Sequence, residues 1–218
     1  MLELKNVTTE IAGTTILRDV SFSVSKGSMV GLIGRNGAGK TTSLRSIMGL
    51  IKPKAGQIVI NGEDMTNQGS FERAGMSIGY MPEDRRLVPD LTVEENIMAP
   101  AWACQLVNAE ARLAWIYEMM PEVESFSDRR ALQLSGGQQK LVALARAMMT
   151  GTNLLLLDEP FEGVAPALSR RLASVLSTLK DEGLTVLLSE SDQSHSADLV
   201  DKAFQIERGS VEPIASLT

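Results

Sequence analysis

The stretch GRNGAGKTT, residues 34–42, follows the continuously apolar run MVGLI at 29–33 and precedes a segment with helical character. It fits the pattern G-x-x-x-x-G-K-[ST], which cradles phosphate when it lies between a strand and a helix. Glycines let successive backbone N–H groups curl around phosphate oxygens, and the positive end of the helix adds attraction. The alternative, a glycine-rich turn with a solvated lysine, does not account for this context. We therefore predict an α/β fold that binds a nucleoside triphosphate here.

Three side chains of this loop have chemistry suited to a triphosphate. Lys40 has the reach to contact the β- and γ-phosphates, and the Thr41 hydroxyl is a ligand that Mg²⁺ accepts. Thr42 is a plausible further donor to the α-phosphate. The predicted phosphate-binding residues are Gly34, Arg35, Asn36, Gly37, Ala38, Gly39, Lys40, Thr41 and Thr42.

Acidic residues end another apolar run, LLLLDEP at 154–160. A carboxylate at the end of a buried strand is costly unless a cation pairs with it. Asp158 is therefore predicted to hold Mg²⁺, partly through water. Glu159 would then lie beside the γ-phosphate and orient an attacking water. The alternative is an Asp-Glu pair that caps a helix before Pro160.

The segment LSGGQ, residues 134–138, leads into a helix expected from Gln138. Ser135, Gly136 and Gly137 offer a hydroxyl and bare amides at the start of that helix, which makes a second anion cradle. One triphosphate site needs only one cradle, so the second must serve something else.

These three motifs, in this order, resemble those of the ATP-binding cassette (ABC) family, and the resemblance covers essentially all 218 residues. It implies a P-loop NTPase core of the ABC ATPase type with an antiparallel β subdomain and an inserted helical subdomain. It also implies an ATPase that uses ATP and Mg²⁺. In that family two cassettes dimerise head to tail, so that Ser135, Gly136, Gly137 and Gln138 would contact the ATP of the other subunit.

Two segments, MPEDRRLVPDLTVEENI at 81–97 and EPFEGVAP at 159–166, resemble ATPase subunits of importers for branched-chain amino acids and related amides or urea. The likeness implies a second copy or a homologous ATPase subunit as partner. It further implies transmembrane permease subunits, an extracytoplasmic solute-binding protein, and a peripheral position on the cytoplasmic face of the inner membrane.

By the same likeness, Glu83 stands where most cassettes carry a glutamine that contacts the metal. The residues that follow border a groove for a cytoplasmic helix of the permease, with Arg85, Arg86 and Leu87 as candidate contacts. The alternative for these three residues is a solvated, charged loop.

Two positions depart from the family pattern. Ser191, in LLSESD at 187–192, stands where cassettes commonly place a histidine or, in branched-chain importers, often glutamine; it is expected to be a weaker γ-phosphate contact. His195 is expected to be a surface residue and not a displaced switch.

Ile11 aligns near the aromatic residue that stacks on adenine in many cassettes. Isoleucine gives apolar contact without stacking, so we expect modest ATP affinity and weak preference over GTP.

Composition limits the other function classes. A net charge of −6 argues against a sequence-independent nucleic-acid partner, and none is expected. One cysteine, Cys104, favours a reducing cytosol, and no apolar run is long enough to span a bilayer.

The chain is expected to be one ABC ATPase domain. Residues 1–83 and 134–218 would form the nucleotide-binding core and β lobe, and residues 84–133 the helical lobe. The expected strands are 20–24, 29–33, 57–60, 153–158 and 185–189, with a strand-like N-terminus, a tight turn at Asn61-Gly62 and a final hairpin about Arg208-Gly209. The expected helices are 92–104 with a Thr92–Glu95 capping box, 108–120, one from Gln138, and 166–181. Interior packing is expected for Trp102, Trp115, Cys104, Met119, Met120, Met148 and Met149.

Two further readings remain open. The first is a soluble cassette that moves no solute. One for translation generally carries two such domains joined by a basic linker, whereas this chain has one domain and an acidic balance. One for DNA repair inserts a long coiled coil, and the span from Thr41 to Leu134 is too short and lacks heptads. The other is an exporter or regulatory cassette with an unrelated membrane partner. Only the two segments at 81–97 and 159–166 argue for an importer subunit instead.

Overall fold

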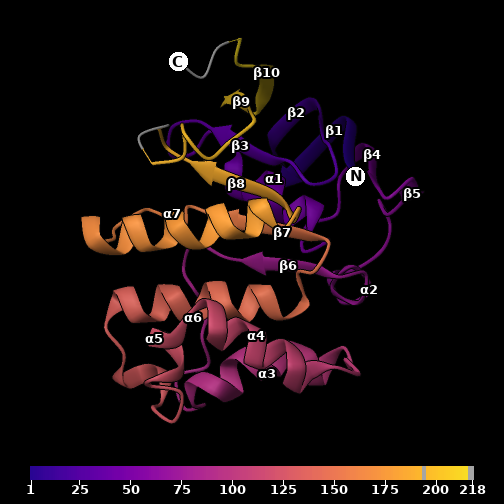
Figure 1. Ribbon diagram of the computed structural model, residues 1–218. Helices are drawn as coiled ribbons and strands as arrows, with labels where there is room; N and C mark the ends of the chain where they lie inside the picture. Colours follow the sequence, from indigo (N-terminus) through magenta and orange to yellow (C-terminus); the bar gives the residue numbers. More distant parts are fainter. Residues whose placement is uncertain (193–194, 216–218) are drawn as a thin grey trace.

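A computed structural model describes residues 1–192 and 195–215, and it contains two β-sheets with helices between and beside them (Figure 1). The six-stranded sheet has the order β10-β9-β3-β8-β7-β6, in which all neighbours are parallel except the edge pair β9–β10. Its strands are β3 (Met29–Ile33), β6 (Ile78–Met81), β7 (Leu154–Asp158), β8 (Thr185–Glu190), β9 (Lys202–Glu207) and β10 (Ser210–Pro213). The continuously apolar run at 29–33 and the largely apolar run at 185–189 are thus central parallel strands, as predicted.

Alternate residues of these strands face two different cores. Leu155 and Leu157 of β7 belong to one hydrophobic cluster, together with α6 (Gly136–Thr150) and α7 (Pro166–Asp181). Leu154 and Leu156 belong to the other cluster, together with α1 (Lys40–Ile47). This alternation follows from the period of two along a strand, and it leaves the carboxyl ends of the strands at one edge of the sheet.

The second sheet is antiparallel, with the order β2-β1-β4-β5, and it covers the α1 side of the first sheet. Its strands are β1 (Leu2–Ile11), β2 (Thr14–Val24), β4 (Ala55–Ile60) and β5 (Glu63–Asp64); the short α2 (Ser70–Gly75) follows them. Asn61 and Gly62 both have positive φ and form the tight turn between β4 and β5, as predicted.

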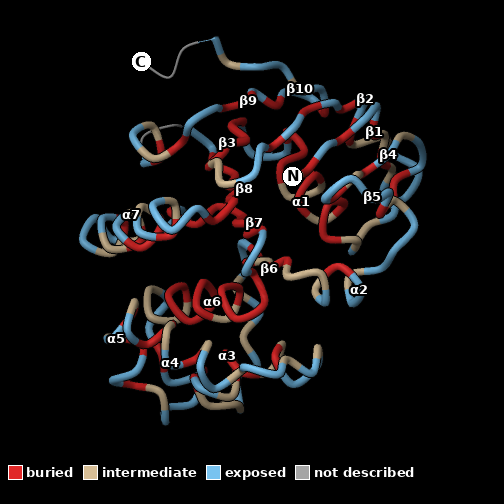
Figure 2. Tube along the Cα trace, turned by 45° about the vertical axis from the view of Figure 1, so that its right-hand side comes forward, coloured by how far each residue is buried: buried red, intermediate tan, exposed pale blue. Residues whose placement is uncertain are grey.

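Helices gather on the other side of the six-stranded sheet. They are α3 (Val93–Ala103), α4 (Ala109–Met119), α5 (Pro121–Glu124) and the 3₁₀ helix η1 (Ala131–Gln133). Figure 2 shows α6 buried along most of its length, with the sheet on one side and α3–α5 on the other. Thr92 caps α3 through the predicted capping box with Glu95. Residues 84–133, expected to form the helical lobe, thus contain α3, α4, α5 and η1.

The packing prediction for Trp102 was wrong, and those for Trp115 and Cys104 hold only in part. The side chain of Trp102 is 56% exposed, because it lies on the side of α3 that faces away from α6 and the core. Trp115 and Cys104 are only partly buried; Trp115 lies against the core with the Arg112 guanidinium stacked 3.8 Å from its ring centroid. Met120, Met148 and Met149 are buried as expected, and Met119 is half-buried against the same core.

Candidate functional site

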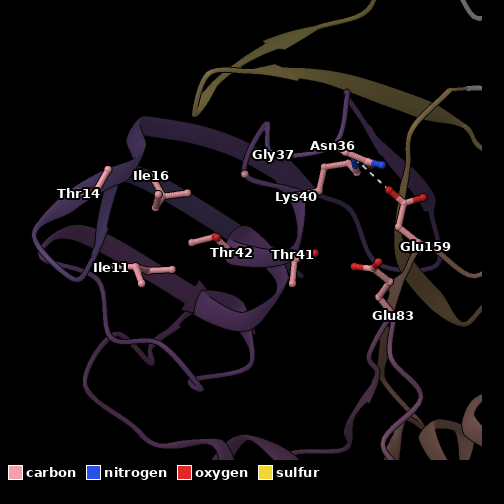
Figure 3. A pocket seen from close by; sticks show the side chains of 11 residues that line it. Ile11, Thr14, Ile16, Asn36, Gly37, Lys40, Thr41, Thr42, Glu83 and Glu159 are labelled. Atoms are coloured by element: carbon pink, nitrogen blue, oxygen red, sulfur yellow. Dashed lines mark ion pairs between the residues drawn. The ribbon is translucent and has the colours of Figure 1, made fainter.

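A cavity of about 630 Å³ opens beside the phosphate loop (Figure 3). It brings together residues from β1, β2, the loop after β3, α1, the segment after β6 and the end of β7. The lining residues are Ile11, Thr14, Ile16, Asn36, Gly37, Gly39, Lys40, Thr41, Thr42, Glu83 and Glu159. The structure therefore places the predicted phosphate loop, Ile11, Glu83 and Glu159 around one space.

The glycines of the loop meet different backbone demands. Gly37 and Gly39 have φ of 80° and 116°, in the region that side chains strongly disfavour. Gly34 has ordinary φ, but a Cβ there would lie 2.2 Å from the carbonyl oxygen of Ile206 in β9. The loop therefore needs glycine at 37 and 39 for conformation and at 34 for the close approach of the neighbouring strand.

Lys40 is buried at the start of α1, and its ammonium contacts three oxygens. It donates to the carbonyls of Gly34 and Arg35 and forms an ion pair with Glu159, where Nζ lies 2.9 Å from Oε1. An ammonium has three N–H donors, so a phosphate oxygen would have to replace one of these contacts. The Glu159 contact is the one that a side-chain rotation alone can release.

Asp158 is fully buried at the end of β7 and accepts hydrogen bonds from three hydroxyls. Thr41 Oγ1 lies 3.1 Å and Ser189 Oγ 2.8 Å from its Oδ1, and Tyr80 Oη lies 3.3 Å from Oδ2. Burial raises the pKa of Asp158 above its ordinary value, and these hydrogen bonds oppose that rise. A cation beside this carboxylate would offset the cost of burying its charge.

Glu159 and Ser191 meet across the strand ends. Ser191 Oγ lies 3.1 Å from Oε1 of Glu159 and 3.1 Å from Oδ1 of Asn36 in the phosphate loop. A hydroxyl has one proton, so it donates to one of these oxygens at a time. Ser191 thus lies beside Glu159 and the phosphate loop, and its contact with the γ-phosphate stays a prediction.

The remaining predicted loop residues lie behind or outside this cavity. Arg35 and Ala38 line a neighbouring cavity of about 440 Å³ against β9. The structure does not bring the LSGGQ residues to the cavity within one chain: Ser135 caps α6 instead, and its Oγ accepts a hydrogen bond from the Gln138 amide. Gly136 and Gly137 form the first turn of α6, which begins two residues earlier than predicted because Ser135 is the cap.

The side chains of the loop after β6 point either to the helical lobe or to an open groove. Arg85 turns toward α6, where it donates to the Gly136 carbonyl and the Gln139 side chain. Leu87 packs against the helical core. Only Arg86 of the three predicted contact residues lines an open groove of about 450 Å³ between α2, α3 and α6, beside Phe71.

His195 is an exposed residue, as predicted. Its Nδ1 lies 3.1 Å from the Ser169 hydroxyl, and its ring lies 5.5 Å from that of Phe161.

Two site residues escaped the sequence analysis. Ser189, a buried serine inside the apolar run TVLLSE, also accepts the Glu159 amide at 3.1 Å. Lys140 is buried in α6 and donates to the carbonyls of Glu159 and Glu162. A polar residue within an apolar strand was a usable signal for Ser189, whereas nothing near Lys140 in the sequence points to residues 159–162.

Comparison with known proteins agrees with this geometry. Residues 17–162 match the ABC transporter family. The chain is 35% identical to the high-affinity branched-chain amino acid transport ATP-binding protein BraG of Pseudomonas aeruginosa, over 97% of this chain and 91% of that protein. It is 33% identical to the lipopolysaccharide export system ATP-binding protein LptB of Escherichia coli K12, over 95% and 87%.

Among solved structures, a dimeric ATP-binding cassette in a post-hydrolysis state with ADP and Pi bound superposes with a TM-score of 0.88 at 27% identity, over 100% of this chain and 99% of that one. The predicted family and fold class are thereby confirmed. The chain belongs to the ABC transporter family and is an ATP-hydrolysing cassette of that family.

Proposed function

We propose that this chain is the ATPase subunit of a membrane importer for branched-chain amino acids or related small amides and carboxylates. The observation that carries the ATPase part is the cavity in which the phosphate loop, Lys40 and Glu159 converge. The importer part is supported by the segments at 81–97 and 159–166 and by the 35% identity to BraG.

Each site residue has a role in this proposal. The loop from Gly34 to Thr42 holds the phosphates, Glu159 orients the attacking water, and Ser191 is a weak contact to the γ-phosphate. Ile11 provides an apolar wall for the base. These roles follow from the chemistry of the groups and from their places around the cavity.

The donor set beside Lys40 fits Mg²⁺. Thr41 and Asp158 supply oxygen ligands, and Glu83 lines the same cavity. Among the described residues no cluster of three or more acidic, histidine or cysteine side chains could hold a metal ion by itself. Mg²⁺ suits such a site, because it usually binds through one or two side chains plus substrate phosphates and water, and it would neutralise phosphate charge.

A second copy or a homologous ATPase would complete the site. Ser135, Gly136, Gly137 and Gln138 start α6 away from the cavity of their own chain, with Ser135 and Gly136 exposed. In a head-to-tail dimer they would face the ATP of the other subunit, where the helix N-terminus suits a phosphate.

The groove lined by Arg86 and Phe71 is the proposed docking site for a cytoplasmic helix of the permease. Leu50, Pro100 and Ala103 also line it, which gives an apolar floor with cationic edges. No helix in the described parts of the chain is long and apolar enough to cross a membrane. Attachment to permease subunits would therefore hold the chain at the cytoplasmic face, and a solute-binding protein would act only through them.

The alternative is the ATPase of another transporter type, because LptB is similar at 33% identity over nearly the same span. A soluble cassette that moves no solute is a further alternative, and the docking groove disfavours it.

Turnover of ATP by the purified chain, beside Glu159→Gln, tests the catalytic assignment. The amide keeps the shape of the carboxylate but cannot accept a proton, so we expect turnover to be abolished with ATP binding retained. Light scattering should show ATP-dependent dimers of Glu159→Gln if a homodimer is competent. Unchanged turnover would contradict the role of Glu159.

Uptake by cells tests the transport assignment. Replacing the chain with Glu159→Gln in its own host should abolish uptake of labelled leucine, valine or a short amide. Normal uptake together with loss of lipopolysaccharide at the cell surface would favour the export alternative.

A further inference from the structure

Lys140 is a buried lysine, and burying its charge costs free energy. Its side chain is 4% exposed, and its Nζ donates to the main-chain carbonyls of Glu159 at 2.7 Å and Glu162 at 2.6 Å. Burial, and next the positive charge of Arg85, lower the pKa of Lys140 to about 8. Burying an ammonium costs several kcal/mol unless its partners compensate. The fold therefore keeps a costly cation against one particular turn.

That turn has a strained backbone at the proposed catalytic residue. Glu159 has φ of 50°, in the left-handed region, which costs a side-chain-bearing residue about 1–3 kcal/mol and persists only where surrounding contacts enforce it. Its amide donates to Ser189 Oγ at 3.1 Å. Its carbonyl accepts from Lys140 and from the Glu162 amide at 3.2 Å. The peptide groups on both sides of the Glu159 Cα are thus fixed by hydrogen bonds.

The direction of the Glu159 carboxylate follows from this backbone. From its left-handed Cα the side chain reaches Lys40 and Ser191 at the cavity, while the carbonyl points the other way, to α6. Lys140 does not line the cavity. Any effect of Lys140 on hydrolysis must therefore pass through the main chain of residues 159–162.

We propose that Lys140 is a positioning residue for hydrolysis, which holds the carbonyls of Glu159 and Glu162 and thereby aims the Glu159 carboxylate at the phosphate loop. The inference rests on the proposed role of Glu159. It also gives α6 a mechanical link to the site, because Lys140 stands two residues after Gln138 on the same helix.

The test is steady-state turnover of the full chain with Lys140→Met, which keeps the length of the stem and removes the donors. We expect kcat to fall about 100-fold, as for a catalytic group displaced by about 1 Å, with KM for ATP nearly unchanged. Lys140→Arg, which restores a cationic donor, should recover part of the rate. Lys180→Met is the control, because Lys180 donates to the carbonyl of Leu199 at 2.7 Å, pairs with Asp201 and does not line the cavity. Its kcat should stay near that of the parent chain.

A double variant separates positioning from general stability. Adding Lys140→Met to Glu159→Gln should leave the residual single-turnover rate unchanged, because the carboxylate on which Lys140 acts is already gone. Thermal unfolding checks each variant, and Lys140→Gln replaces Lys140→Met if the latter does not fold. A normal kcat, or a raised KM with normal kcat, would overturn the inference. Retained turnover in Glu159→Gln alone would instead overturn the role of Glu159.

Discussion

Single residues set the affinity and the chemistry of the cavity. Ile11 is 43% exposed at the end of β1 and lines the cavity with Thr14 and Ile16, so this wall is aliphatic and hydroxylic. Such a wall makes apolar contact with any base but offers no ring to stack on. Base discrimination should accordingly be weak.

Ile11→Tyr should raise the affinity for ATP. Stacking of a base on an aromatic ring is worth about 1–3 kcal/mol, so we expect a gain of roughly fivefold or more. Isothermal titration with ATP and GTP measures it, and Ile11→Leu is the control for size. No gain in ATP affinity with tyrosine would mean that the base lies elsewhere.

The buried carboxyl of Glu190 makes the free energy of unfolding depend on pH. It is 4% exposed at the end of β8; burial raises its pKa from 4.5 to about 7, the Ser196 hydroxyl opposes the rise, and the charges of Asp192 and Glu159 add to it. Between about pH 4.5 and 7 the unfolded chain loses this proton while the folded chain keeps it. Stability should therefore fall through that window as pH rises.

Glu190→Gln should remove this fall, because the amide stays neutral. Urea unfolding should show the variant gaining on the parent chain from pH 5 to 7, by a few kcal/mol in all since each pKa unit is worth about 1.4 kcal/mol, with a constant difference above pH 7. Glu118→Gln, at an exposed position on α4, should follow the parent chain. Parallel curves for Glu190→Gln and the parent would contradict the assignment.

At the scale of elements, α1 is held at both ends. Its start is fixed by the phosphate loop, and its end is capped by Arg73 of α2, a fully buried residue. The Arg73 guanidinium donates to the carbonyls of Ser46 and Ile47 at the end of α1 and to those of Met65 and Gln68. One cation thus donates to the last carbonyls of a helix and ties α2 to it.

Arg73→Met should destabilise the chain strongly. The substitution removes all four hydrogen bonds of the buried guanidinium, and Ser46 and Met65 keep only the backbone donors Gly49 and Gln68. We expect a loss of about 3–5 kcal/mol in the free energy of unfolding. Urea unfolding measures it, with Arg73→Lys expected to recover part of the loss. Glu72→Gln on the exposed side of α2 is the control. Equal stability of Arg73→Met and the control would show that water replaces the guanidinium.

Elements with a strong local pattern were predictable, and contacts between distant segments were not. The apolar run MVGLI, the Thr92 cap and the turns at Asn61-Gly62 and Arg208-Gly209 all form where the sequence indicates. The four-residue β6 and the six-residue α2 are too short to show a period, and their positions come from packing. For the same reason Arg73 and Lys140 were missed: each is defined by carbonyls that only the folded chain brings to it.

At the scale of the whole molecule, the groove between α2, α3 and α6 joins the two parts of the fold. Phe71 is 64% exposed there, an unusual position for a large aromatic side chain. The groove lies on the side of β6 and α6, and the same loop after β6 contributes Arg86 to it and Glu83 to the nucleotide cavity. A partner seated in the groove would therefore contact the segment that also lines the cavity beside the phosphate loop.

Phe71→Ser should weaken the complex with the permease subunits. Full burial of a phenylalanine is worth about 1.5–3 kcal/mol, so affinity should fall at least roughly tenfold, with the thermal unfolding midpoint little changed. Val107→Ser is the matched control, because Val107 is 96% exposed and lies outside the groove. Binding of the chain to permease purified from host membranes measures both. The same loss in both variants would remove the groove from the interface.

The ion pair between Lys40 and Glu159 has a consequence for the order of events in a catalytic cycle. The carboxylate that we propose as the activator of water would also compete with the γ-phosphate for the Lys40 ammonium. A triphosphate that takes Lys40 sets the carboxylate free, so the base is released only when its substrate is present. A diphosphate has only its β-phosphate to hold Lys40, so the Lys40–Glu159 pair would form again more readily once the γ-phosphate has left. In the empty site the Glu159 carboxylate would therefore stay paired with Lys40 and be unavailable as a base.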